Sequence, residues 1–230
     1  MLIALLHSPL TGPAAWEPVA ASLRRRGLRV VAPTLVEAFD ADPPYHRAIA
    51  GRVGRQIAEA GPDGPVTLVA HSGAGALLPA IAAAVPQVEG AVFVDALLPH
   101  PGRNWFATVP PEMREHLKGL VDGDRLPRWS DWFPPEVIEG LLPDPEQRRR
   151  FIGELPRTPL AYFEETAPSP ESWPPRRCAY VRLSDGYRDE EAEASRLGWP
   201  VRRLDGDHLS IMTRPEAVAE ILDGQVNDRW

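Results

Sequence analysis

Ser72 lies at the junction of an apolar run and an alanine-rich segment, in the stretch VTLVAHSGAGALLPAIAA that spans residues 66–83. A residue at the apex of a strand-to-helix turn has a strained backbone and projects its side chain clear of both elements. Such a turn requires small neighbours, and Ala70, Gly73 and Ala74 meet that requirement. A helix N-terminus also aims free N–H groups at the apex. The pattern predicts a serine nucleophile with the Gly73 N–H as an oxyanion donor.

His208 supplies the second group for such chemistry. It ends the polar stretch LDGDH (residues 204–208), which follows an expected strand and precedes an expected helix that starts at Pro215. A histidine in such a loop can take a serine proton and return it. The alternatives are a merely solvated histidine or a metal site with Asp205 and Asp207, which lacks further His or Cys ligands at useful spacing. We expect His208 to be the base, with no metal and no organic cofactor.

Short apolar runs alternate with helical patterns along the sequence, and the strands and helices that they predict would position Ser72 and His208. We expect strands at residues 1–6, 28–32, 66–69, 91–94, 178–183 and 201–204, and helices at 16–26, 43–60, 73–84 and 215–222. This order predicts an α/β fold: a mostly parallel six-stranded sheet with helices on both faces. Ser72 then falls at the carboxyl end of a strand, where such sheets bind ligands. Pro79 predicts a kink or a displaced first turn in the helix after Ser72.

Residues 98–175 break this alternation. They hold 15 of the 27 prolines and four of the seven tryptophans, with helical pieces at 134–142 and 145–155 and no convincing strand. Their large apolar side chains argue against a disordered linker. We expect a core domain of residues 1–97 and 176–230, and an inserted helical cap of residues 98–175.

The composition of the chain limits the classes of partner that we expect it to bind. The chain has 230 residues, a net charge of −7 and a single cysteine, Cys178. The acidic balance makes nucleic acid and anionic membranes poor partners. No run approaches the roughly 18 apolar residues of a membrane span, and the N-terminal apolar stretch is too short for a signal peptide. We expect a cytoplasmic protein that binds a small-molecule substrate, with a homodimer left open.

The stretch AHSGA (residues 70–74) resembles the nucleophile elbow of the α/β-hydrolase superfamily, with alanines where Gly-x-Ser-x-Gly has glycines. The superfamily also places its histidine last in chain order, in a loop like that of His208. The stretch LLHSPLTG (residues 5–12), followed by WEPV at 16–19, resembles the His-Gly-x oxyanion loop and its helix. This stretch is most similar to the small-esterase branch that includes plant methyl esterases and hydroxynitrile lyases. The resemblance covers residues 1–97 and 176–224.

The resemblance implies roles for further residues. Family members usually carry the acid just past the strand after the cap, so Asp185 is our first choice, with Asp189 a weaker option. Asp95, at the end of the fourth expected strand, is the alternative. Either could orient His208.

The oxyanion loop departs from the family pattern at Pro9, which has no N–H to give. We expect Gly73 and Leu10 to line the oxyanion hole, with the Ser8 hydroxyl as another possible donor. Substrate is expected to contact His7 and Ser8 of the loop and Trp105 and Trp132 of the cap.

The leading hypothesis is a serine hydrolase that acts on a small to medium apolar ester, thioester or lactone through an acyl-enzyme. The alternative is a lyase or cyclase of the same fold, in which Ser72 and His208 transfer protons without an acyl-enzyme. A non-catalytic binding protein is the third hypothesis.

Overall fold

The computed structural model describes residues 1–227, and in this range six strands form one sheet in the order β2-β1-β3-β4-β5-β6. All neighbouring strands pair in parallel, which confirms the predicted α/β class. The strands are β1 (Leu2–Leu6), β2 (Arg29–Val31), β3 (Val66–Ser72), β4 (Val88–Ala96), β5 (Arg177–Arg182) and β6 (Val201–Arg203). The central strands read as continuous apolar runs because both of their faces are buried.

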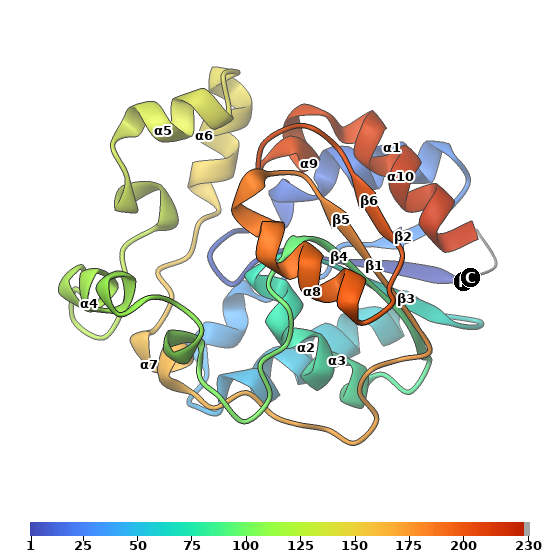
Figure 1. Cartoon of the computed structure of the whole chain (residues 1–230), viewed down its shortest axis with the longest axis horizontal. Helices are drawn as coiled ribbons and strands as arrows, with labels where there is room; N and C mark the ends of the chain where they lie inside the picture. The colour runs from blue at the N-terminus through green and yellow to red at the C-terminus, as the bar shows by residue number, and fades with distance from the viewer. Residues whose placement is uncertain (228–230) are drawn as a thin grey trace.

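Helices cover both faces of the sheet (Figure 1). One face carries α1 (Glu17–Arg25), α9 (Ser210–Thr213) and α10 (Pro215–Asn227), and the other carries α2 (Tyr45–Glu59), α3 (Leu78–Ala84) and α8 (Arg188–Arg196). Alternate residues of β1 point into the two cores: Ile3 and Leu5 into the first, and Leu2, Ala4 and Leu6 into the second. None of the helices within residues 1–227 is long and apolar enough to cross a membrane.

The segment after Ser72 begins as a 3-10 turn, η3 (Gly73–Leu77), and becomes an α-helix only at Leu78. Pro79 therefore stands in the first turn of α3, where a missing N–H costs no intrahelical hydrogen bond. The displaced first turn that Pro79 predicts is confirmed. Two more 3-10 turns, η1 (Pro13–Ala15) and η2 (Val36–Asp40), follow β1 and β2.

Most of the chain between β4 and β5 lies beyond the carboxyl ends of the strands, and its last segment, residues 165–176, returns past α2 and α3 to the start of β5 (Figure 1). It contains η4 (Trp105–Ala107), α4 (Pro111–Gly119), η5 (Trp129–Trp132), α5 (Pro135–Leu141), α6 (Pro145–Gly153) and α7 (Leu160–Glu164). Two hydrogen bonds tie it to the loop after β1: the Thr158 hydroxyl donates to the Pro9 carbonyl at 2.9 Å, and the Ala14 N–H donates to the Glu154 carboxylate at 2.8 Å. Positions 228–230 of the predicted core domain lie outside the described residues.

Candidate functional site

Ser72 is the last residue of β3 and has φ 57° and ψ −130°. A positive φ is unfavourable for a residue with a Cβ and marks a position that the surrounding packing enforces. That packing explains the small neighbours. A Cβ on Gly75 would stand 2.0 Å from the Leu97 carbonyl oxygen, so only glycine fits there. A Cβ on Gly73 would lie 3.2 Å from both Ser8 Oγ and Pro9 Cδ, so the loop after β1 lies directly against the turn.

Asp95 is the carboxylate that meets His208. The His208 Nδ1–H donates to Asp95 Oδ2 at 2.8 Å. The Leu183 and Ser184 N–H groups each donate to Asp95 Oδ1 at 2.9 Å, and the Ser184 hydroxyl donates to Oδ2 at 2.6 Å. Burial would raise the pKa of Asp95, but the hydrogen bond and charge of His208 and the donors of Leu183 and Ser184 hold that pKa below its ordinary value. Asp95 is therefore an ionised, fully buried partner of His208.

A β-bulge places Asp95. In the β3–β4 pairing, His71 lies opposite Val94 and Ser72 opposite Ala96, so Asp95 is the extra residue on β4. Its φ of 44° fits the local kink that a bulge imposes. The bulge re-aims the side chain toward the loops that follow β5 and β6.

The predicted contact between Asp185 and His208 is wrong. Asp185 begins the turn η6 (Asp185–Tyr187), its side chain is 71% exposed, and it pairs with Arg182 at 2.8 Å and Arg188 at 2.7 Å. The hydrogen bond from Arg188 is the main reason that the pKa of Asp185 lies below its ordinary value. The physical reason for the error is register: the chain turns outward at Asp185, and the next side chain that faces the site is Tyr187.

Two rings pack against the imidazole of His208. His71 stacks on it with ring centres 4.4 Å apart, and Tyr187 lies almost parallel to it at 5.0 Å with an angle of 9° between the planes. The His71 Nε2–H also donates to the His208 carbonyl at 2.8 Å. Burial lowers the pKa of His71 far below its usual value, so His71 remains neutral. The residue before the serine thus anchors the histidine loop, a role that its position in the motif does not reveal.

Ser72 and His208 line one cavity of about 460 Å³. Ser72 Oγ forms a hydrogen bond with the Tyr187 hydroxyl at 3.3 Å. Among the described residues, no hydrogen bond joins Ser72 Oγ directly to His208. The expected Trp105 and Trp132 line this cavity, together with Trp129, Phe133, Met113 and Leu117, which were not predicted. The long chain between β4 and β5 thus provides most of the apolar wall.

The loop after β1 differs from the expected arrangement. Leu10 lines the cavity, but its N–H donates to Ser8 Oγ at 3.2 Å and is thereby engaged. Ser8 is 1% exposed, and its oxygen lies against Gly73 rather than on the cavity wall. Because the Leu10 N–H occupies a lone pair of Ser8 Oγ, the hydroxyl hydrogen of Ser8 remains free to donate.

His7 does not line the cavity either. It is fully buried, donates from Nδ1 to the Ser8 carbonyl at 2.9 Å and accepts the Leu35 N–H at Nε2 at 3.2 Å. Both ring nitrogens are used, so His7 fixes the course of the loop. The predicted contact of His7 with substrate therefore does not match its position, and Ser8 adjoins the cavity only through its hydroxyl beside Gly73.

Acidification should destabilise the fold through His7. Burial lowers the pKa of His7 from 6.5 to about 4, so between these values the unfolded chain binds a proton that the folded chain does not. Stability therefore falls as the pH drops through this window, by about 2 kcal/mol at pH 5 from this group. Urea unfolding at pH 7 and pH 5 should show a smaller loss for His7→Gln than for the unsubstituted chain. Equal losses in the two proteins would contradict this assignment.

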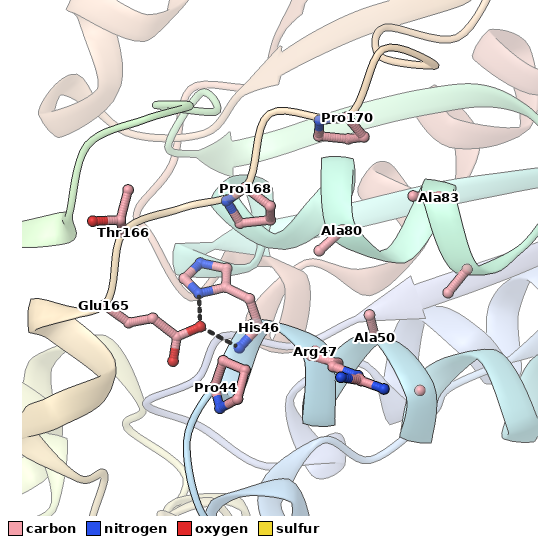
Figure 2. A pocket seen from close by; sticks show the side chains of 12 residues that line it. Pro44, His46, Arg47, Ala50, Ala80, Ala83, Glu165, Thr166, Pro168 and Pro170 are labelled. Atoms are coloured by element: carbon pink, nitrogen blue, oxygen red, sulfur yellow. Dashed lines mark hydrogen bonds and ion pairs between the residues drawn. The ribbon is translucent and has the colours of Figure 1, made fainter.

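A second cavity of about 500 Å³ lies between α2, α3 and the segment after α7 (Figure 2). Its floor consists of small residues, including Ala50, Ala80 and Ala83. Glu165 accepts the N–H groups of Tyr45 at 2.5 Å and His46 at 3.0 Å, and also pairs with His46 Nδ1 at 2.9 Å. The carboxylate of Glu165 thus caps the start of α2. The two cavities are similar in volume, and Ser72 and His208 line only the first of them.

Comparisons with solved structures agree with the fold. Among solved structures, an extracellular alpha/beta-hydrolase from a Paenibacillus species matches with a TM-score of 0.80 at 20% identity, covering 99% of this chain and 100% of that one. A pyrethroid hydrolase from Sphingobium faniae JZ-2 matches with a TM-score of 0.72 at 21% identity, covering 99% and 98%. Tomato methylketone synthase I, in a variant complexed with beta-ketoheptanoate, matches with a TM-score of 0.72 at 15% identity, covering 98% and 97%.

Sequence comparison defines the family. No curated protein matches the chain, but the profile described as "Alpha/beta hydrolase family" matches residues 3–221. That match includes all of the sheet except Leu2, the turn at Ser72 and the loop of His208. The resemblance seen in the sequence is confirmed, and the chain belongs to the alpha/beta hydrolase family.

Proposed function

We propose that the protein is a serine hydrolase that cleaves a small to medium apolar ester, thioester or lactone through an acyl-enzyme on Ser72. The observation that carries this proposal is the hydrogen bond between His208 and the buried Asp95, in the cavity to which the strained turn presents Ser72. A buried, ionised carboxylate on Nδ1 leaves the other ring nitrogen, Nε2, able to accept a proton.

The proposed reaction begins when the Ser72 hydroxyl leaves Tyr187 and turns to His208. Such nucleophile–base contacts often tighten only when substrate binds. Ser72 Oγ attacks the acyl carbon, His208 takes its proton, and the same proton passes to the leaving group. Asp95 stabilises the imidazolium without accepting that proton. Water then attacks the acyl-enzyme by the same route and regenerates Ser72.

The oxyanion of the tetrahedral intermediate would accept hydrogen bonds from the Gly73 N–H and, in place of a backbone group at Pro9, from the Ser8 hydroxyl. The Leu10 N–H supports Ser8 in this arrangement rather than meeting the oxyanion itself. Preorganised donors of this kind stabilise the transition state because they need no reorientation during the reaction.

The substrate class follows from the cavity wall. Trp105, Trp129, Trp132 and Phe133 surround the space above Ser72, and aromatic walls favour apolar ligands. We assign residues 98–175 the role of a cap that selects the acyl or alcohol group. The single cysteine, which is buried, supports the cytoplasm as the compartment.

A panel of p-nitrophenyl esters with acyl groups from acetyl to phenylacetyl tests the proposal. We expect saturable hydrolysis that favours the larger apolar acyl groups, because these bury more surface against the tryptophans. Rapid mixing should reveal a burst of p-nitrophenol where deacylation limits turnover. A folded protein that hydrolyses none of these esters would contradict the proposal.

Proton-transfer chemistry is the second candidate. It is favoured by one observation: the Leu10 N–H is already engaged, so the site offers fewer backbone donors to an oxyanion than expected. In that case activity on the true substrate would require Ser72 and His208, yet no acyl-enzyme could be trapped by acid quench and mass spectrometry.

A further inference from the structure

Tyr187 is the residue that contacts both members of the Ser72–His208 pair. Its hydroxyl lies 3.3 Å from Ser72 Oγ, and its ring stacks on the imidazole of His208. It ends η6, directly after the loop whose N–H groups bind Asp95, and it lines the same cavity. Stacking against His208 and the turn of η6 therefore fix the direction of this hydroxyl toward the reacting oxygen.

The side of Ser72 on which Tyr187 lies indicates what its hydroxyl can reach. The oxyanion donors proposed above, the Gly73 N–H and the Ser8 hydroxyl, adjoin each other where the loop after β1 packs on Gly73. Tyr187 lies instead beside His208. The leaving-group oxygen must also lie near His208, because the imidazole that takes the serine proton delivers it to the leaving group.

The protonation of Tyr187 fits a donor. Burial raises the pKa of its hydroxyl well above the ordinary value, although the hydrogen bond with Ser72 partly opposes the shift. The phenol therefore remains neutral throughout the pH range in which an esterase works, and it donates a hydrogen bond rather than acting as a base. In the resting enzyme its hydroxyl lies 3.3 Å from Ser72 Oγ, and either oxygen can donate in this hydrogen bond.

We propose that Tyr187 is a catalytic residue whose hydroxyl donates a hydrogen bond to the leaving-group oxygen during acylation; this inference rests on the proposed function. Ser72 Oγ first forms its bond to the acyl carbon, and when the resulting tetrahedral intermediate collapses, the bond from that carbon to the leaving-group oxygen breaks. The serine proton passes through His208 to the departing oxygen, giving an alcohol. Tyr187 keeps its own proton and stabilises the negative charge on that oxygen until His208 delivers the proton.

The contribution of the Tyr187 hydroxyl to the rate of acylation should depend on the leaving group. An alkoxide leaving group develops much charge and needs the donor, whereas p-nitrophenolate departs without such help. We expect Tyr187→Phe, which keeps the stacked ring, to lower kcat/KM for ethyl butyrate about 30-fold, in the range of a single hydrogen bond to a charged group. The loss for p-nitrophenyl butyrate, which has the same acyl group, should be less than about threefold.

Two controls accompany this comparison. Tyr162→Phe removes a buried hydroxyl that does not line the Ser72 cavity, so the rates with both esters should be unchanged. Thermal unfolding should show that Tyr187→Phe is folded. Equal losses for the two esters, or no loss for either, would overturn the role of Tyr187 while leaving the hydrolase assignment intact. If the unsubstituted protein hydrolyses neither ester, the proposed function itself fails, and the inference fails with it.

Discussion

Replacing Asp95 with asparagine should lower kcat for ester hydrolysis about 10⁴-fold, the size of effect that loss of the orienting carboxylate has in serine hydrolases. Asparagine keeps the shape, so it can still accept the N–H groups of Leu183 and Ser184. Its amide, however, can donate to His208, which would hold the imidazole in the tautomer that cannot accept the serine proton. Stopped-flow and steady-state assays on p-nitrophenyl butyrate would measure the loss.

The matched control is Asp185→Asn, which changes the carboxylate that the sequence favours. Because Asp185 is exposed and pairs with Arg182 and Arg188, we expect its kcat to stay within about twofold of the unsubstituted enzyme, since surface ion pairs contribute little. A large loss in Asp185→Asn together with a small loss in Asp95→Asn would reverse the assignment. Circular dichroism would confirm that both variants are folded.

Replacing Ser72 with alanine should remove hydrolysis almost entirely, with kcat lower by about 10⁶-fold, as when the nucleophile of a catalytic triad is deleted. The turn directs the Ser72 side chain into the cavity, and the neighbouring Tyr187 hydroxyl, whose pKa is raised by burial, keeps its proton and does not replace this nucleophile. Assays at high enzyme concentration, with freshly purified Ser72→Ala to avoid contamination, would set the residual rate. A variant that retained more than a tenth of the activity would rule out a nucleophilic role.

The same position permits a stability test. Ser72→Gly also lacks the hydroxyl but tolerates the φ of 57° that alanine cannot adopt without strain. The free energy of unfolding of Ser72→Gly should therefore be about 1 kcal/mol higher than that of Ser72→Ala, although glycine gains more freedom in the unfolded chain. Urea unfolding of the two inactive variants would measure the strain that the turn imposes. A glycine variant that is less stable than the alanine variant by about 0.4–1 kcal/mol, the usual entropic cost of glycine, would mean that the turn is unstrained.

The parts of the site that depend on local pattern could be predicted from the sequence. The apolar run before Ser72 and the small residues after it define the turn within a few positions, and the same holds for the loop of His208. The fold follows from the alternation of periodicities, because each strand and helix carries its own pattern.

The parts of the site that depend on strand register and on long-range contacts could not be predicted from the sequence. Asp95 points at His208 because of a bulge in β4 and because Leu183 and Ser184 supply N–H groups from a distant strand end. Neither feature leaves a mark in the sequence near Asp95. Tyr187 lies two residues after Asp185, and nothing in the sequence indicates its contact with Ser72.

Helix α8 was also missed, for a compositional reason. Its sequence, RDEEAEASR, has no apolar stripe, and its buried residues include Glu191 and Ala194. The Glu191 carboxylate pairs with Arg182 of β5 at 2.6 Å and also with Arg203 of β6. An ion-pair network thus contributes to the contact of α8 with the sheet. Because the prediction of helices relied on an apolar stripe, a helix held in this way was not recognised.

Labelling with a fluorophosphonate would show whether Ser72 is an activated nucleophile. The unsubstituted protein, incubated with the probe and mapped by mass spectrometry, should carry one adduct per chain on Ser72. Ser72→Ala should carry none, and Asp95→Asn should react far more slowly, because His208 would no longer be held as a base. A folded protein that stays unlabelled, or that is labelled at other residues while Ser72 is unmodified, would show that Ser72 is not an activated nucleophile.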